Sequence, residues 1–400
     1  MKTPIILSLA FITSLTAVAQ SDTTVIVHKY PQLFPDKDSS DTSPVQVSFI
    51  YPLSTNGVQA PQISNNFSFN VLYGVNGGVN GCEIGGLVNV NTSDVNGIQV
   101  GGLGNITAGA STGTVIGGIA NIVKDSTHGI FVAGISNVAG DTSAGFEIAG
   151  ISNSVNGSFV GGQVAGISNF TNGSVNGFQF SGIANLSNGN LNGAQISGIV
   201  NAVHGNLNGT QIGLINYADT VKGTQIGLIN LAKSGEDAVT IGLLSLVHNG
   251  YHSLEFSTNE SIYGQMALKL GVPQFYSSFR FGITKNNDQG ILTYGYGIGS
   301  MISLNEKNKI AFDLNSNQLI TNFFDYDLDL LNRFEITYRR FIGKHFELFA
   351  GPALNVYVTQ LWQENNYGSL HIPYSLYDEN WSSGRVAIWA GMQAGFAIRL

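Results

Sequence analysis

Apolar and glycine positions recur at a fixed interval of sixteen residues through the first half of the chain. A second glycine series keeps the same interval from Gly81 to Gly209. Self-similarity at a short fixed period is typical of stacked repeat architectures. It predicts that residues 81–249 form small coils piled on one another. The pattern Gly-[Ile/Leu]-x-Asn begins at Gly86, Gly102, Gly118, Gly134, Gly150, Gly166, Gly182 and Gly198.

The residue types within one unit predict strands and glycine corners. Phe180 and Ile183 occupy positions that stay apolar from unit to unit, whereas the position of Gln179 is usually polar. Strand alternation then places Phe180 and Ile183 inside and Gln179 outside. The repeated glycines exclude helix, since each costs about 1 kcal/mol in a helix interior. We expect each unit to be two short strands and two turns around a narrow apolar interior.

An asparagine follows each corner, and these asparagines are expected to stack as a structural ladder. Each amide can donate to the next coil and accept from the previous one, for about 1 kcal/mol net. About ten coils of 14–16 residues, stacked at ~4.8 Å, would make a rod of roughly 50 Å. The predicted ladder consists of Asn89, Asn105, Asn121, Asn137, Asn153, Asn169, Asn185 and Asn201.

Three other interpretations of the repeats stay open. A row of identical residues can also be an ice- or glycan-binding face. Calcium-binding repeats carry a Gly-Gly-x-Gly-x-Asp signature, which is missing here. The units could instead be hairpins of one large barrel, although two transmembrane strands of about 9–11 residues do not fit a sixteen-residue unit.

From residue 251 onward the period becomes two. Met392, Phe396 and Leu400 share one face of the final segment, and Gln393 and Arg399 share the other. Apolar-out, polar-in alternation predicts about eight strands of a small membrane barrel, and a soluble sandwich is the alternative. The last strand should pair with the first. Similar alternation runs near 252–258, 265–270, 279–284, 294–299, 310–315, 333–339 and 345–359.

The polar and aromatic positions of these strands predict two further features of a barrel. Charged residues on the inner face would form an internal network of Arg280, Asp313, Arg333, Glu335, Arg339 and Arg399. Aromatic residues suited to the two membrane interfaces are Tyr263, Tyr276, Tyr294, Trp362, Tyr374, Trp381 and Trp389.

The N-terminus predicts export. Met1-Lys2, a short apolar run and Ala17-Val18-Ala19 form a signal peptide over residues 1–19, with cleavage before Gln20. We then expect a flexible segment at 20–50, cap strands at 51–80, the solenoid at 81–249 and an outer-membrane-type barrel at 250–400. The fold class is all-β.

Composition narrows the function. Charged residues make up 10% of the chain against a typical ~25%, which favours a membrane or fibrous protein. A net charge of −8 argues against nucleic acid as a partner. Cys82 is the single cysteine, so no disulfide framework is possible, and we expect it to be a small buried filler. No residues suggest a catalytic, cofactor or metal site, and we expect no cofactor and no enzyme activity.

The repeats resemble a family of Gram-negative surface-repeat outer-membrane proteins. The residues that carry the resemblance are segments 45–53 and 66–70 and the units of the form Gly-x-Gln-x-x-Gly-Ile-x-Asn. The resemblance covers residues 45 to 249 and implies a place in the outer membrane or at the cell surface, but no particular activity. We therefore expect a non-enzymatic structural, display or adhesion protein. Its expected partners are outer-membrane lipid and either surface glycans or another surface protein. The alternative is a pore or transport protein in which repeats and C-terminal strands form one larger barrel.

Overall fold

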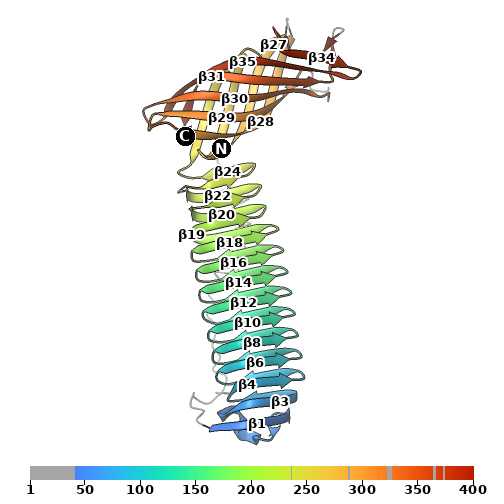
Figure 1. Ribbon diagram of the computed structural model, residues 1–400, viewed down its shortest axis with the longest axis vertical. Helices are drawn as coiled ribbons and strands as arrows, with labels where there is room; N and C mark the ends of the chain where they lie inside the picture. Colours follow the sequence, from blue (N-terminus) through green and yellow to red (C-terminus); the bar gives the residue numbers. More distant parts are fainter. Residues whose placement is uncertain (1–40, 236, 287–288, 322–326, 364–365, 373) are drawn as a thin grey trace, which may run out of the picture.

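The computed structural model describes residues 41–235, 237–286, 289–321, 327–363, 366–372 and 374–400. The predicted signal peptide (1–19) and the first part of the predicted flexible segment (20–40) lie outside these residues. The described chain is a parallel β-solenoid of about 11 turns followed by a closed antiparallel barrel of 8 strands. Figure 1 shows the solenoid as a long rod with the barrel at one end. The predicted fold class is confirmed.

One coil of the solenoid consists of a long strand, a glycine corner, a short strand and a turn. In the coil that starts at Val95, β6 (Val95–Gly101) is followed by the corner Gly102-Leu103 and then by β7 (Gly104–Thr107). Equivalent strands of successive coils pair in parallel, so that Val95 lies beside Ser111. Residues sixteen apart therefore stack directly on one another.

The other strands of the rod repeat this arrangement. The long strands are β4 (Gly78–Gly85), β8 (Ser111–Gly117), β10 (Thr127–Ala133), β12 (Ser143–Ala149), β14 (Phe159–Ala165), β16 (Val175–Ser181) and β18 (Leu191–Ser197). The short strands are β5 (Val88–Asn91), β9 (Ala120–Val123), β11 (Ser136–Ala139), β13 (Ser152–Val155), β15 (Ser168–Thr171), β17 (Ala184–Ser187) and β24 (Leu244–Val247). A short strand and the next long one merge in β19 (Val200–Ile212). In the following coils, β20 (Ile215–Val221) and β22 (Ile229–Gly235) join the short strand to the start of the long one, whose last residues form β21 (Thr224–Ile226) and β23 (Val239–Ile241).

The second glycine series permits close stacking of the long strands. Gly97 has a φ of 134°, and a Cβ there would lie 2.0 Å from the carbonyl oxygen of Gly81. A positive φ recurs at every sixteenth residue from Gly81 to Gly209. Any larger residue would strain the backbone and collide with the preceding coil, which explains why this series keeps the period.

The N-terminal end of the rod is closed by β1 (Asp41–Ile50), β2 (Leu53–Ser54), η1 (Gly57–Gln62) and β3 (Ile63–Asn76). β1 runs parallel to β3, and β2 folds back against β1. The prediction of a flexible segment is therefore wrong for residues 41–50, because β3 supplies backbone partners that local sequence does not reveal.

The barrel has eight main strands. They are β25 (Tyr251–Asn259), β26 (Gly264–Val272), β27 (Phe275–Asn286), β28 (Gln289–Ser303), β29 (Asn308–Ile320), β30 (Asp329–Ile342), β31 (Phe346–Thr359) and β35 (Gly384–Arg399). The short strand β34 (Tyr377–Trp381) pairs with the start of β35, and β32 (Trp362–Gln363) pairs with β33 (Asn366–Tyr367).

The last strand closes the barrel against the first, as predicted. β35 and β25 are antiparallel, with Ser253 beside Arg399 and Asn259 beside Gln393. The alternative of one larger barrel is wrong, because the strands of the rod and those of the barrel belong to separate sheets.

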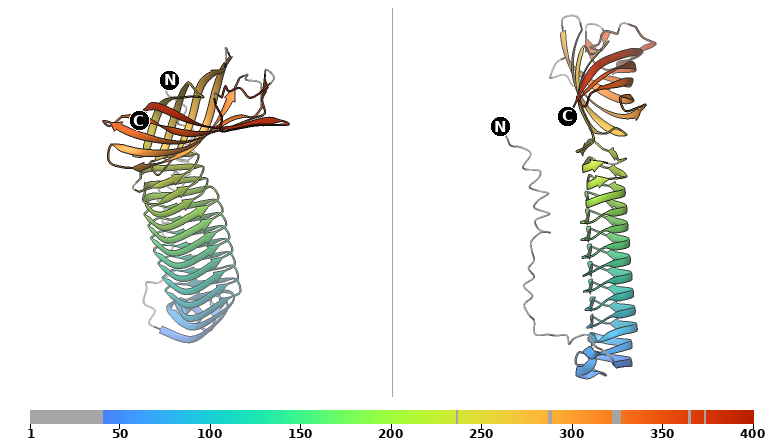
Figure 2. Two further views of the ribbon diagram at one scale, coloured as in Figure 1. Left: turned by 45° about the horizontal axis from the view of Figure 1, so that its top comes forward. Right: turned by 90° about the vertical axis from the view of Figure 1, so that its left-hand side faces the viewer.

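The rod joins the barrel at the end where the connections between barrel strands are short. Strands are linked at this near end by residues 273–274, 304–307 and 343–345, whereas the far end carries the connection 260–263 and the two longest ones, 321–328 and 360–383. The corner carbonyl of Gly242, in the last coil, accepts hydrogen bonds from the hydroxyls of Ser277 (2.8 Å) and Tyr296 (3.3 Å). Figure 2 shows the rod and the barrel meeting at this one end of the barrel.

Candidate functional surface and polar interiors

The predicted asparagines form a continuous ladder inside the rod. Each is the second residue of its short strand and is at most 2% exposed. Each side-chain amide donates to the Oδ1 of the next asparagine at 2.8–3.0 Å. The same amide donates to a backbone carbonyl beside the next corner, as from Asn153 to Val164 at 2.9 Å. The ladder therefore ties each corner to its neighbour.

Sequence reasoning missed both ends of this ladder. Asn70 donates to Asn89 at one end, and Asn201 is followed by Asn216, Asn230 and Ser245 at the other. The Gly-[Ile/Leu]-x-Asn pattern recurs at spacings of 14 or 15 residues at Gly213 and Gly227, and with Ser245 in place of the asparagine at Gly242, so the sequence carried the signal that extends the predicted ladder.

A second ladder, of glutamines, runs in the opposite direction. Gln225, Gln211, Gln195 and Gln179 each donate to the preceding glutamine at 2.7–2.9 Å. The series ends where Gln163 donates to the carboxylate of Glu147 at 2.7 Å. A carboxylate suits this end because it accepts a hydrogen bond without offering a donor in return.

Glu83 ends a shorter branch of the same row. Its carboxylate accepts bonds from Asn70 (2.8 Å), Asn76, Asn91 (2.7 Å) and Gln99 (2.8 Å). Burial raises the pKa of Glu83 to about 7, against the lowering effect of these four amides. Burial likewise raises the pKa of Glu147, which has only two hydrogen-bond donors, Ser143 and Gln163.

The predicted inside and outside of the long strand are reversed. Gln179 is fully buried, whereas Phe180 and Ile183 are 38% and 44% exposed. The expected apolar interior is present beside the turns, where Phe159, Val175 and others form a core cluster, and in the two coils where Val115 and Phe131 replace the buried glutamine. Alternation fixes which residues share a face but not which face is inward. Polar residues are inside here because stacking gives each amide a partner in the next coil.

Because of this reversal, the corner side of the rod carries uninterrupted rows of exposed apolar residues. We call these two rows the apolar edge. The corner row is Leu87, Leu103, Ile119, Ile135, Ile151, Ile167, Ile183, Ile199, Leu214, Leu228 and Leu243, and every member is exposed. The neighbouring row, on the long strands, is Val47, Phe69, Ile84, Val100, Ile116, Val132, Ile148, Val164, Phe180, Ile196, Ile212, Ile226 and Ile241, exposed or half-buried throughout.

The opposite edge of the rod is polar. Apart from the buried Glu83 and Glu147, the charged residues described in the coils lie where the chain passes from the short strand to the next long one, either in a turn or, for Asp219 and Lys233, within β20 and β22. These residues are Asp94, Lys124, Asp125, Asp141, Asp219, Lys222, Lys233 and Asp237. The prediction that Cys82 is a buried filler is wrong, because its side chain is half-exposed beside the apolar edge.

The interior of the barrel is filled by charged side chains. Lys269 lies 3.0 Å from Asp313, and the Arg280 guanidinium lies 2.8 Å from Glu335. Five of the six predicted network residues are buried, and Arg399 reaches the rim near Glu347. Glu255 and Glu347 join the network from strand positions that sequence reasoning left out.

The far end of the barrel is closed by an apolar cluster. Trp389, Tyr357 and Ile262 are fully buried there, and Leu370 packs against them from the long connection 360–383. The Tyr357 hydroxyl accepts a hydrogen bond from the backbone amide of Ser369 at 2.8 Å. The expectation that Tyr276 and Trp389 lie in interfacial girdles is wrong, because both side chains point inward and are buried.

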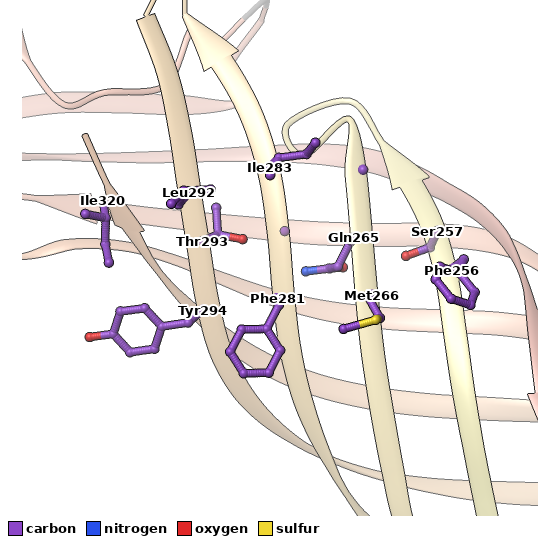
Figure 3. Close-up of a pocket in the computed structure, with 12 residues that line it drawn as sticks. Phe256, Ser257, Gln265, Met266, Phe281, Ile283, Leu292, Thr293, Tyr294 and Ile320 are labelled. Atoms are coloured by element: carbon purple, nitrogen blue, oxygen red, sulfur yellow. The ribbon is translucent and has the colours of Figure 1, made fainter. Parts of the chain in front are cut away.

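The outer wall of the barrel is apolar. A shallow hollow of about 530 Å³ lies on this wall across β25 to β29. Figure 3 shows side chains that line it from neighbouring strands, among them Phe281, Met266 and Tyr294. Because its walls are mainly apolar and it lies on the exterior, the hollow suits a hydrocarbon chain better than a polar substrate.

No group of three or more His, Cys, Asp or Glu side chains among the described residues could hold a metal ion. Within the same ranges, no helix is long and apolar enough to cross a membrane. Comparison with protein-family models, curated proteins and solved structures finds no match to this chain. The resemblance to surface-repeat outer-membrane proteins therefore stays a prediction.

Proposed function

We propose that the protein is a non-enzymatic outer-membrane protein, in which the barrel is the anchor and the solenoid is a structural arm. The observation that carries the proposal is the polarity of the closed barrel. Phe281 is 56% exposed on its outer wall, whereas its neighbour Arg280 is 3% exposed inside. Strands of outer-membrane barrels alternate in this way, with apolar side chains toward lipid and polar ones inside. Closure of the sheet meets the second requirement of a bilayer, because no strand edge is left unpaired in hydrocarbon.

The connections between strands favour one orientation. Outer-membrane barrels have short turns on the periplasmic side and longer loops outside. The rod joins the end with short turns, so the proposal places it in the periplasm. A scaffolding role then fits the rod better than adhesion at the cell surface. Contacts with surface glycans or another surface protein would be made by the far-end loops.

The alternative of a pore has less support. Buried ion pairs fill the barrel from Glu255 to Glu335, and an apolar cluster closes its far end. An eight-stranded barrel is just wide enough for side chains to fill. We expect no steady conductance in a planar bilayer, and an open channel of defined size would contradict the proposal.

Cysteine labelling tests both the anchoring and the orientation. In a Cys82→Ser background, Ser382→Cys lies in a far-end loop and Thr142→Cys in a turn of the rod, and both positions are exposed. A membrane-impermeant maleimide should label only Ser382→Cys in intact cells, and both after the outer membrane is permeabilised. Labelling of Thr142→Cys in intact cells would place the rod outside. A protein absent from the outer-membrane fraction would remove the anchoring proposal itself.

A further inference from the structure

The apolar edge is too large to be incidental. Its two rows run along the whole rod without a charged residue, and the members of the corner row are 41–51% exposed. With some 25 residues about two-fifths exposed, its area is on the order of 1,500 Å², against about 300–600 Å² for the largest patch on a typical soluble monomer. Leaving such an area in water is costly, at about 25 cal/mol per Å².

The apolar edge continues into the outer wall of the barrel. Its last corner, at Gly242, lies against Ser277 on β27 and Tyr296 on β28. Both side chains belong to outward-facing positions. Ser277 alternates with the inward-facing Tyr276 on β27, and Tyr296 lies on the same face of β28 as the exposed Tyr294 and Ile298. The edge therefore meets the wall that the proposed function places against lipid.

We propose that the apolar edge rests on the periplasmic leaflet of the membrane that holds the barrel, so that the rod lies along the bilayer. This inference rests on the proposed function. An amphipathic element binds in an interface when one side is apolar and the other polar, with its apolar side about 5–10 Å deep. The rod has this division between its corners and its charged turns.

The arrangement of the two parts favours lipid over a second copy of the chain. In Figure 1 the arrowheads of the long strands, and with them the corners, point to the side on which the far-end strand β34 lies. The far-end strand β34 thus lies on the same side of the rod as the apolar edge. A second copy of the rod that packed on the apolar edge would also have to fit beside the barrel wall, which adjoins the edge at Gly242.

Quenching by lipids tests the inference. The full-length protein, in a Cys82→Ser background, is reconstituted in phosphatidylcholine vesicles containing lipids with a nitroxide on the acyl chain. A fluorophore is attached to Leu214→Cys on the apolar edge, or to Asn208→Cys as a control on the same coil. Leu214 is 51% exposed, and Asn208 is also exposed, near the turn side. Phe281→Cys reports on the barrel wall.

We expect the nitroxide lipids to quench the fluorophore at Leu214→Cys and Phe281→Cys strongly, and that at Asn208→Cys weakly. Quenching at Phe281→Cys without quenching at Leu214→Cys would overturn the lipid contact and leave the anchoring intact. No quenching at Phe281→Cys would overturn the proposed function instead. A disulfide-linked dimer through unlabelled Leu214→Cys, without quenching, would assign the edge to a second copy and overturn the inference.

Discussion

Asn153→Ala should destabilise the rod while leaving the barrel unchanged. The side-chain amide of Asn153 donates to Asn169 Oδ1 at 2.9 Å and to the carbonyl of Val164 at 2.9 Å, and its Oδ1 accepts from Asn137 at 2.9 Å. The same amide also donates to the carbonyl of Glu147 at 3.2 Å. Alanine removes all four bonds within a fully buried row. Three acceptors and one donor each lose a partner, and a buried unsatisfied group costs about 1–3 kcal/mol.

The expected loss is about 2–5 kcal/mol, since Asn137 keeps a carbonyl partner, the Ile148 oxygen at 2.9 Å. Asn156→Ala is the matched control. Asn156 belongs to the same coil but is exposed, and its side chain makes two exposed bonds of 3.3 Å, to the carbonyl of Gly140 and from the amide of Asn172. Its removal should change the free energy of unfolding by less than about 0.5 kcal/mol.

The distribution of tryptophans makes the assay specific. All three tryptophans, Trp362, Trp381 and Trp389, lie in the barrel region, so tryptophan fluorescence reports unfolding of the barrel. Far-UV circular dichroism reports the strands of both the rod and the barrel, so a change in the dichroism transition without a change in fluorescence is assigned to the rod. In urea titrations of the full-length protein, Asn153→Ala should move the dichroism transition to lower urea and leave the fluorescence transition in place. Dichroism transitions at the same urea concentration for Asn153→Ala and Asn156→Ala would refute the ladder as a source of stability.

Three other perturbations follow from the same structure. Burial raises the pKa of Glu147 in the folded protein above its unfolded-state pKa of about 4.3. The contribution of Glu147 to the free energy of unfolding is therefore full below pH ~4.3 and is lost as the pH rises through the folded-state pKa. Glu147→Gln, which keeps an acceptor for the glutamine ladder, should thus be more stable than wild type at pH 8 and equal to it at pH 4. Each unit of pKa shift corresponds to about 1.4 kcal/mol of stability. If urea titrations gave the same stability difference between Glu147→Gln and wild type at both pH values, ionisation of the buried Glu147 would not be its cause. Gly145→Ala should prevent stable folding of the rod, because its Cβ would lie 2.0 Å from a backbone carbonyl of the preceding coil at a φ of 119°. Gly290→Ala, with open space around its Cβ, should keep the wild-type dichroism melting curve, and equal curves for both glycine variants would contradict the close stacking. Phe281→Arg, at mid-strand on the outer wall, should weaken membrane insertion by about 2–4 kcal/mol, whereas Ser303→Arg at the rim should cost about 0–1, as measured by folding into vesicles in urea. Equal costs for these two arginine variants would argue against a lipid-facing wall.

The strands of the barrel could be predicted because each carries its own evidence. In β30, Glu335 alternates with Phe334 and Ile336, and one face is buried while the other is exposed. When a strand has charged residues on one face and apolar residues on the other, only one orientation fits a membrane barrel, with the charged face inside. The inward position of Trp389 was not predictable in this way, because an aromatic residue is compatible with either side.

The coils of the rod were predictable in outline but not in orientation. The sixteen-residue period determined the corners, the short strands and the asparagine ladder. It did not determine that Gln195 is buried and Ile199 exposed, which is the reverse of the usual distribution. A glutamine side chain within one coil has no partner, and only the adjacent coil supplies one, as Gln179 does for Gln195 at 2.8 Å.

The sequence by itself therefore determined the period of the rod, the alternation of the barrel strands and the boundary between the rod and the barrel. The tertiary structure decided which face is inside. Stacking at about 4.8 Å converts a row of amides into a chain of hydrogen bonds, a gain that no single coil can have. The consequence is an apolar row on the outside of the rod, from Leu87 to Leu243, which local sequence could not have placed there.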